Sequence, residues 1–430
     1  MSKYQQFIFS DYRLDDQKKQ LTLSYKLDDQ LSFDELYRFD FPWSNDLDHS
    51  VLDRALQFLF FMAGVSYYKT YLPPQIVIQR GQLDKIGADF FSKTYRKGLG
   101  EFFYINNLDP NTPINFPTTA SKLKPISPPD DKGLLIGVGG GKDSLVSVEL
   151  LRSQPRVATW SVGHRSQLDP LISKIGLPHF WVERTWDRQL LELNGKDAYN
   201  GHIPISAIFA CVGVIVAILA GYRDVVVSNE SSASEPNLVY KNVPINHQYS
   251  KSLEFERDFQ NFLKNNFEDS IRYYSFLRPL TELRISELFA KVGFDKYKDV
   301  FTSCNRAFVH TSDSIFWCGE CPKCAFTFLA LTPFITREKL EAFWNGKNLL
   351  FDSLLEPTYR QLLGIEGDKP LECVGEVKES RAAMRLAQEI YPELKKYQFD
   401  LLTDYNFRAL SPHTMPEEIA KFLFSVVQRV

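Results

Sequence analysis

The sequence has no excess of charge of either sign, since 50 lysine and arginine residues stand against 53 aspartate and glutamate residues, a formal net charge of −3. This balance provides no overall field to attract a phosphate polyanion, so no nucleic-acid partner is expected. Low-complexity tracts are also absent, and 44% hydrophobic residues provide enough material for packed cores. The 430 residues exceed the roughly 250–300 at which one core stops growing, so about two or three domains are expected.

Long apolar runs are scarce. The N-terminus, MSKYQQFIFSDYRLDD, lacks the apolar core and cleavage site of a secretory signal, so we expect a cytoplasmic protein. The most apolar run, residues 205–221, is at the lower limit of a membrane span. We interpret it as a buried helix and expect no membrane span.

The first 125 residues combine strand and helix patterns. Three segments between residues 5 and 40 are rich in β-branched and aromatic residues and are separated by Asp-rich turns, which predicts an antiparallel meander. Helical periodicity follows from Asp48 and again over 86–99, with a short strand between the two. Six prolines between residues 107 and 131 indicate a linker. These patterns predict an N-terminal α+β domain over residues 1–125.

Strands and helices alternate over residues 130–335. Apolar strand patterns at 134–138, 157–162, 179–183 and 224–228 alternate with helical segments. Repeated strand–helix units predict a parallel sheet with helices on both faces, so the expected fold class is α/β. The remaining residues, 336–430, have mostly helical patterns.

The segment Gly137–Ser144, GVGGGKDS, lies between a predicted strand and a predicted helix. Glycines allow the backbone close to phosphate oxygens, and the free N–H groups at a helix start favour anions. A Walker A loop would require glycine in place of Ile136 and serine or threonine in place of Asp143. A dinucleotide fingerprint would require glycine in place of Lys142. The alternative is a tight turn, with Lys142 in solvent and Ser144 as an ordinary helix cap.

This segment resembles the pyrophosphatase loop of the N-type ATP pyrophosphatases, Ser-Gly-Gly-x-Asp-Ser, with Gly139 in place of the first serine. The resemblance implies a sheet of the adenine nucleotide alpha hydrolase type and cleavage of ATP between the α- and β-phosphates, with transfer of AMP to an oxygen. It assigns Mg²⁺ binding to Asp143 and the offset of phosphate charge to Lys142. The implied ATP-binding residues are Gly139, Gly140, Gly141, Lys142, Asp143 and Ser144.

Two further strands end in polar residues. Ser228 and Glu230 follow the strand at 224–228 and are expected at the same sheet edge as the glycine loop, where they would line a substrate crevice. His164 follows the strand at 157–162 and is a weaker candidate for an adenine contact. Asn and Ser clusters also form ordinary loops, which is the alternative interpretation.

Four of the six cysteines are clustered in the sequence. Cys318, Cys321 and Cys324 form the pattern CGECPKC, and Cys304 lies upstream, which is enough for a closed tetrahedral Zn²⁺ site with a structural role. An iron–sulfur cluster remains an alternative. We assign Cys211 and Cys373 to packing.

Five segments together resemble the UDP-N-acetylmuramoyl-L-alanyl-L-glutamate epimerases of bacterial peptidoglycan synthesis. They are GVGGGKDS (137–144), SNESSASEPN (228–237), NHQYSKSLEFE (246–256), CGECPKC (318–324) and KPLECVGE (369–376). The resemblance implies a UDP-muramoyl dipeptide substrate whose terminal L-glutamate is adenylated, inverted through loss of the α-proton and released with AMP and pyrophosphate.

The epimerisation base is not identified by the sequence. His247, Lys251 and Glu254 are candidates because they lie on the flank of an expected helix whose buried face carries Phe255 and Phe259. A solvated helix side is the alternative. Other adenylating enzymes of the same fold, a 7-cyano-7-deazaguanine synthase or a tRNA-modifying enzyme, are the competing hypotheses.

Overall fold

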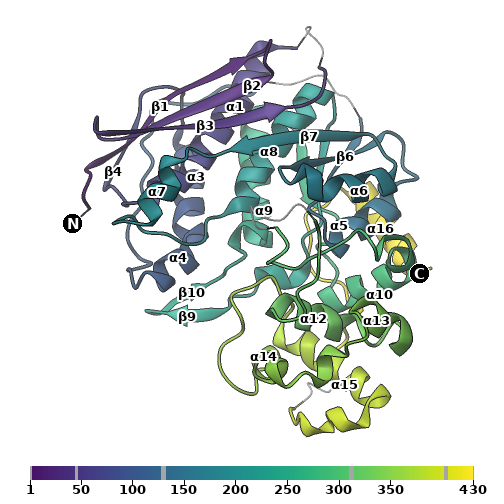
Figure 1. The fold of residues 1–430 in the computed structure, drawn as a ribbon. Helices are drawn as coiled ribbons and strands as arrows, with labels where there is room; N and C mark the ends of the chain where they lie inside the picture. The colour runs from purple at the N-terminus through teal and green to yellow at the C-terminus, as the bar shows by residue number, and fades with distance from the viewer. Residues whose placement is uncertain (1, 44–46, 127–131, 309–313, 401–404, 430) are drawn as a thin grey trace.

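The computed structural model describes residues 2–43, 47–126, 132–308, 314–400 and 405–429. Its centre is a nine-stranded sheet of order β11-β8-β5-β6-β7-β3-β2-β1-β4 (Figure 1). The strands of this sheet are β1 Gln6–Asp15, β2 Gln20–Leu27, β3 Leu31–Phe39, β4 Gln75–Ile78, β5 Leu134–Gly137, β6 Val157–Val162, β7 His179–Thr185, β8 Asp224–Val227 and β11 Arg272–Ser275.

The five strands from β11 to β7 pair in parallel. The alternating pattern predicts four of them, β5 to β8, and β11 is an addition. Their side chains alternate between two hydrophobic cores: Leu135 and Val225 belong to one, and Ile136 and Val226 to the other. Burial on both faces is the reason for continuous apolar strands. The chain is therefore a mixed α/β protein with a large, mainly parallel sheet flanked by helices.

Helices cover both faces of the sheet. The first core includes residues of α1 His49–Ala63, α3 Lys85–Gly98, α8 Ile205–Ala220 and α9 Leu253–Phe267. The second includes residues of α5 Lys142–Leu151, α6 Arg165–Ile175, α10 Glu282–Val292, α12 Pro322–Leu331, α15 Val377–Ile390 and α16 Glu417–Val427. Shorter elements are α2 Val65–Tyr68, α4 Gly100–Ile105, α7 Gln189–Asn194, β9 Leu238–Tyr240, β10 Val243–Ile245, α11 Phe294–Tyr297, α13 Arg337–Phe343 and α14 Glu356–Leu362.

The N-terminal strands belong to the same sheet as the parallel strands. The expected meander β1-β2-β3 forms, but β3 then pairs antiparallel with β7, and α1 packs on α8. One core therefore extends over both sides of the proline-rich segment. Pairing with β7 covers the edges that β3 and β7 would otherwise expose, which is the physical reason for the union.

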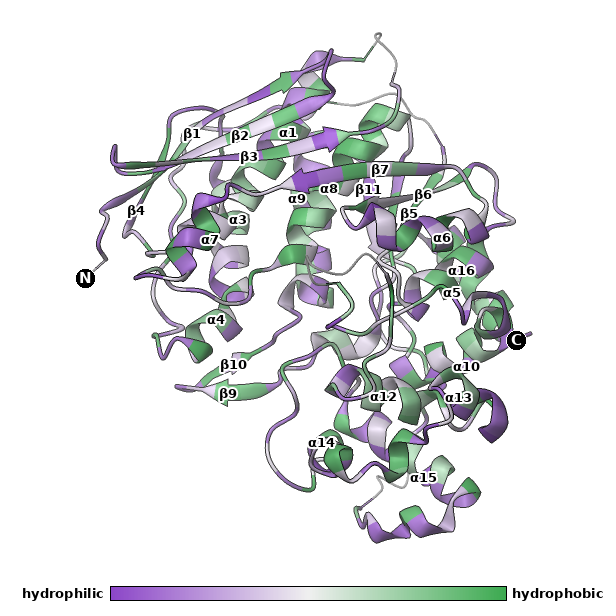
Figure 2. Ribbon diagram, in the orientation of Figure 1, coloured by the Kyte–Doolittle hydropathy of each residue, from purple (hydrophilic) through white to green (hydrophobic). Residues whose placement is uncertain are grey.

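The apolar helix α8 is buried, as expected. Its 16 residues include 12 buried ones, and it packs against α1, β5 and β8. Figure 2 shows hydrophobic residues along α8 on one side of the sheet. Across the described part of the chain, no helix combines the length and apolarity that a membrane crossing requires.

Candidate active site

The glycine loop and the residues after β8 meet where the strand order reverses. Strand β5 pairs with β6 on one side and with β8 on the other. The helix after β5, α5, lies in the second core, whereas α8, which precedes β8, lies in the first. In open α/β sheets, ligands bind outside the carboxyl ends of the strands at such a reversal. The fold therefore places the glycine loop at the position where ligands bind in such sheets.

The loop conformation requires glycine at residue 140. Gly140 has φ +92°, and a Cβ there would lie 2.9 Å from the Phe308 ring and 3.0 Å from the Leu168 side chain. The Thr302 N–H donates to the Gly140 carbonyl at 3.1 Å. A Cβ at Gly139 would meet no atom of the described residues within 4 Å, so these residues leave open space on that side of the loop. The loop is therefore packed against neighbouring residues at Gly140 and open at Gly139, just before the N-terminus of α5.

Lys142 is buried rather than solvated. Its side chain is 1% exposed and its Nζ lies 2.9 Å from Glu282 Oε1, while it also pairs with Asp143. Burial lowers the pKa of Lys142, but the carboxylates of Asp143 and Glu282 outweigh burial and raise this pKa above its usual value. The alternative that Lys142 is a solvated surface lysine is therefore wrong.

Three carboxylates gather beside Lys142. One oxygen each from Asp143, Glu230 and Glu282 lies within 4.8 Å of the others. Burial, followed by the charges of Glu282 and Asp143, raises the pKa of Glu230 to about 7. Glu282 Oε2 is buried and has no hydrogen-bond partner among the described residues. A crowded set of hard oxygen ligands with an unsatisfied atom fits a divalent cation such as Mg²⁺.

Ser144, Ser228 and His164 have local partners. Ser144 is the third residue of α5 and not its cap, which is Gly141; the Ser144 hydroxyl donates to the Gly141 carbonyl at 3.0 Å. Ser228 Oγ lies 2.7 Å from Ser147 Oγ and so joins the end of β8 to α5. His164 is exposed, lies before α6 and bonds Gln167.

A second cluster contains Lys251, His247 and Cys373. Lys251 Nζ donates to Cys373 Sγ at 3.2 Å, and His247 Nδ1 bonds the Glu101 carboxylate. Glu254 is not part of this cluster: it is exposed and pairs with Lys93 at 2.8 Å and Lys97 at 2.7 Å.

The buried Arg278 connects the two clusters. Its guanidinium donates to the carbonyls of Glu230, at 2.6 Å, and of Lys251, and forms an ion pair with Glu256 at 2.9 Å. Arg278 and Glu256 are each 1% exposed. Because one rigid side chain holds both backbone segments, the positions of the two clusters are fixed relative to each other.

The four clustered cysteines converge as their spacing predicts. Their sulfur atoms lie within 4.8 Å of one another, with 3.9 Å between Cys304 and Cys321 and 3.7 Å between Cys318 and Cys324. With Zn–S bonds of about 2.3 Å, the sulfurs of a tetrahedral site are about 3.8 Å apart. The donor set therefore fits one tetrahedral ion, and the thiolates of a cluster of several irons would be held further apart.

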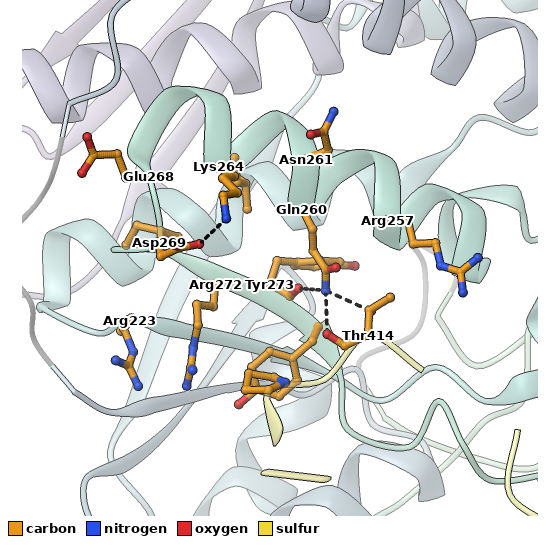
Figure 3. A pocket seen from close by; sticks show the side chains of 14 residues that line it. Arg223, Arg257, Gln260, Asn261, Lys264, Glu268, Asp269, Arg272, Tyr273 and Thr414 are labelled. Carbon is orange, nitrogen blue, oxygen red and sulfur yellow. Dashed lines mark hydrogen bonds and ion pairs between the residues drawn. The ribbon is translucent and has the colours of Figure 1, made fainter. Parts of the chain in front are cut away.

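The cavity of about 520 Å³ shown in Figure 3 lies away from this site. Arg223 and Arg272, which line it, lie at the amino ends of β8 and β11, the edge opposite the glycine loop. A second cavity of about 470 Å³ adjoins the site. Asn237 lines it and accepts the His247 N–H at 3.0 Å.

Comparison with known proteins identifies the family. A model described as the MurL N-terminal domain matches residues 1–276, and one described as the MurL C-terminal domain matches residues 300–401. A UDP-N-acetyl-alpha-D-muramoyl-L-alanyl-L-glutamate epimerase of Salinispora tropica is 39% identical over 391 residues, which cover 89% of this chain and 85% of the relative. The chain belongs to the MurL epimerase family.

Two more relatives carry the same name. The Micromonospora protein is 39% identical over 89% of this chain and 87% of its own length. The Xanthomonas oryzae protein is 37% identical over 86% of this chain and 81% of its own length. The family resemblance inferred from the five segments is therefore confirmed, and both MurL domains contribute residues to the candidate site.

Sequence reasoning missed four residues of this MurL site: Glu101, Arg278, Glu282 and Cys373. Glu282 is the first residue of α10, where an acidic residue is ordinary, so no local signal distinguishes it. Cys373, which we assigned to packing, lies instead beside two basic side chains. Its segment, KPLECVGE, was the one available signal.

Proposed function

We propose that this protein inverts the terminal L-glutamate of UDP-N-acetylmuramoyl-L-alanyl-L-glutamate to D-glutamate, with ATP as a second substrate. The family membership supports epimerisation and a muramoyl dipeptide substrate. One observation supports the ATP-dependent step. The carboxylates of Asp143, Glu230 and Glu282 cluster around Lys142, next to a glycine loop at the end of a parallel strand. The pyrophosphatase-like loop and adenylation are part of this proposal.

Adenylation explains why an epimerase would consume ATP. Removing the α-proton of an ionised glutamate places a second negative charge within about 4 Å of the carboxylate, which costs about 4 kcal/mol at an effective dielectric of about 20. That penalty is a factor of about 10³ in rate. Transfer of AMP to the carboxylate removes its charge and withdraws electrons from the α-carbon. A modest base can then take the proton.

The residues of the first cluster have distinct roles in this step. Asp143, Glu230 and Glu282 would hold Mg²⁺, which when bound neutralises phosphate charge and orients the triphosphate. The glycine loop and the start of α5 offer backbone N–H groups to phosphate oxygens. Lys142, held by Glu282, presents a fixed positive charge beside the same oxygens.

The second cavity is a suitable place for the nucleotide-sugar end of the substrate. Its lining has three basic residues, Lys369, Lys378 and Arg381, and four acidic ones, Glu235, Asp368, Glu376 and Asp400. Lys378 pairs with Glu376 at 2.7 Å, so Lys369 and Arg381 are the cations proposed to meet a diphosphate. It adjoins His247 through Asn237, so a dipeptide that extends from the cavity would reach the second cluster.

The cysteines Cys304, Cys318, Cys321 and Cys324 would hold a structural Zn²⁺. Four sulfur ligands leave no open position for substrate, which indicates a role in stability. The backbone of residue 302, two residues from Cys304, bonds the Gly140 carbonyl, so an ordered cysteine module supports the glycine loop.

The test is incubation in D₂O with Mg²⁺, ATP and the L-glutamate form of the nucleotide dipeptide. Deuterium at the glutamate α-carbon, with AMP and pyrophosphate in the products, is the expected result. Epimerisation without ATP consumption would refute adenylation, and AMP formation without α-exchange would point to another adenylating enzyme. Omission of the dipeptide is the control, because ATP alone should give little AMP.

A further inference from the structure

Cys373 differs from a packing cysteine in its surroundings. Its Sγ accepts from Lys251 at 3.2 Å, and His247 is its other polar neighbour. The Lys323 Nζ donates to the Cys373 carbonyl, which adds a third nearby cation. Cys373 is half-buried, whereas Cys211 is fully buried.

The charges around Cys373 favour its ionised form. Burial raises the pKa of the thiol, but Lys251 and His247 outweigh burial and lower it to about 6. Cys211 in α8 provides the contrast within the same chain, because burial acts there without nearby cations and raises the pKa of the thiol. A thiolate stabilised by adjacent cations is the reactive form of cysteine.

His247 is oriented by a second carboxylate. Its Nδ1 bonds Glu101, and the charges of Cys373 and Glu101 outweigh burial and raise the pKa of His247 to about 9. His202, whose ring centroid lies 4.4 Å from that of His247, has its pKa lowered to about 4 by burial and by His247. His247 is therefore the charged member of the pair, which places a cation on one side of the thiolate and Lys251 on another.

Two lysines, Lys323 and Lys251, link Cys373 to the carboxylate cluster. Lys323 Nζ lies 3.5 Å from Glu282 Oε1 and also donates to the Cys373 carbonyl. Lys251, which contacts the thiol, is anchored through its own carbonyl by Arg278, which also holds Glu230. In an adenylated glutamate the α-carbon is one bond from the activated carbonyl carbon. A base for the α-proton must therefore lie close to the carboxylate cluster, and the contacts of Lys323 and Lys251 place Cys373 in that neighbourhood.

We propose that the Cys373 thiolate is the base that removes the α-proton of the adenylated glutamate, an inference that rests on the proposed function. The Cα–H bond breaks, an S–H bond forms, and the electron pair moves into the activated carbonyl as an enolate. Water protonates the opposite face of the α-carbon, and the resulting hydroxide takes the proton from the thiol. Lys251 and His247 are positioning residues that keep the sulfur ionised.

The experiment separates adenylation from proton transfer. Cys373→Ser and Cys373→Ala are assayed in D₂O for pyrophosphate release and for deuterium at the α-carbon, with Cys211→Ala as the matched control. We expect pyrophosphate release within about threefold of the parent rate and a loss of deuterium incorporation of about 10²–10⁴-fold, the range of general base catalysis. The control should keep both rates.

Other results would overturn the inference. Deuterium incorporation within tenfold of the parent rate in Cys373→Ala would exclude the thiolate as the base. Loss of both reactions at an unchanged unfolding temperature would assign Cys373 to adenylation, and a trapped thioester on Cys373 would assign it to nucleophilic attack. Absence of pyrophosphate release from the parent protein would contradict the proposed function instead.

A second measurement applies if the variants do not fold. The parent protein is treated with iodoacetamide at pH 7, and the modified cysteines are located by mass spectrometry. We expect Cys373 to react before Cys211, with deuterium incorporation lost in proportion and pyrophosphate release retained. Full modification of Cys373 without loss of deuterium incorporation would overturn the inference.

Discussion

Replacement of Arg278 by methionine tests how the site is held together. The guanidinium makes two hydrogen bonds to Glu256, at 2.9 and 3.0 Å, and one to each of the two site carbonyls. After replacement, Glu256 remains buried, and its remaining partners within the described part of the chain are the Ser275 N–H and Thr414 Oγ1. Removing one partner of a buried ion pair costs about 3–5 kcal/mol. At about 1.4 kcal/mol per tenfold change, the folding equilibrium shifts by about 10²–10³·⁵.

The assay is urea unfolding followed by fluorescence, with the free energy taken from the midpoint at constant slope. The double variant Arg278→Met, Glu256→Gln removes the unpaired charge and should recover about 1–3 kcal/mol of the loss. The exposed Arg257→Met on α9 is the control and should change stability by less than about 0.5 kcal/mol. The reasoning is refuted if Arg278→Met loses less than about 1 kcal/mol, or if the double variant is no more stable than the single one.

Four further changes test the site. Asp143→Asn should lower AMP formation by about 10²–10³-fold at an unchanged unfolding temperature, and a smaller effect would remove Asp143 from the phosphate step. Gly140→Ala, at φ +92° and against the Phe308 ring, should raise the KM for ATP, whereas an unchanged KM would contradict the loop assignment. Cys321→Ser should lower soluble yield and reduce bound zinc below one per chain by elemental analysis; full zinc content would contradict a four-sulfur site. The rate of deuterium incorporation should rise with pH as the thiol of Cys373 ionises near pH 6, and should then level off. Lys251→Met should shift the rising part of this pH profile to higher pH, because the cation that favours the thiolate is lost. An unchanged pH profile would show that Lys251 does not lower the pKa of the Cys373 thiol.

Local periodicity is sufficient to predict most of the elements. Strands β5 to β8 and helix α8 follow from largely apolar runs bounded by turns, because burial on both faces favours apolar side chains at most of their positions. Strand β11 was missed, since RYYS is short and its apolar side chains also suit a loop. The pairing of β3 with β7 could not be predicted, because two edge strands more than 140 residues apart leave no local signal.

The glycine loop could be predicted because all of its residues lie in one continuous segment of the sequence. The position of GVGGGKDS at the tip of β5 follows from the rule that parallel strands end at the same edge. In the second cluster, the sequence indicated His247 and Lys251 as candidates. Glu101 and Cys373 were not predictable, since they come from distant segments and each alone is an ordinary residue.

Helix phase explains why Glu254 was chosen instead of Glu256. The pattern of Phe255, Phe259 and Phe262 sets the buried face of α9. Both glutamates flank that face, on opposite sides, so the pattern does not distinguish them. The structure buries Glu256 against Arg278 and leaves Glu254 to the lysines of α3.

The two regions that match the MurL domain models, residues 1–276 and 300–401, contribute different groups to the proposed reaction. The residues proposed for the phosphates, Lys142, Asp143 and Glu230, lie in the first matched region, whereas Cys373 lies in the second. Lys323, also in the second region, contacts both the Cys373 carbonyl and Glu282. A parallel sheet with its glycine loop can bind and activate a carboxylate, but it does not supply a base beside the α-carbon. In our proposal the second region supplies that base through Cys373, and the contact between Lys251 and Cys373 joins it to the first region.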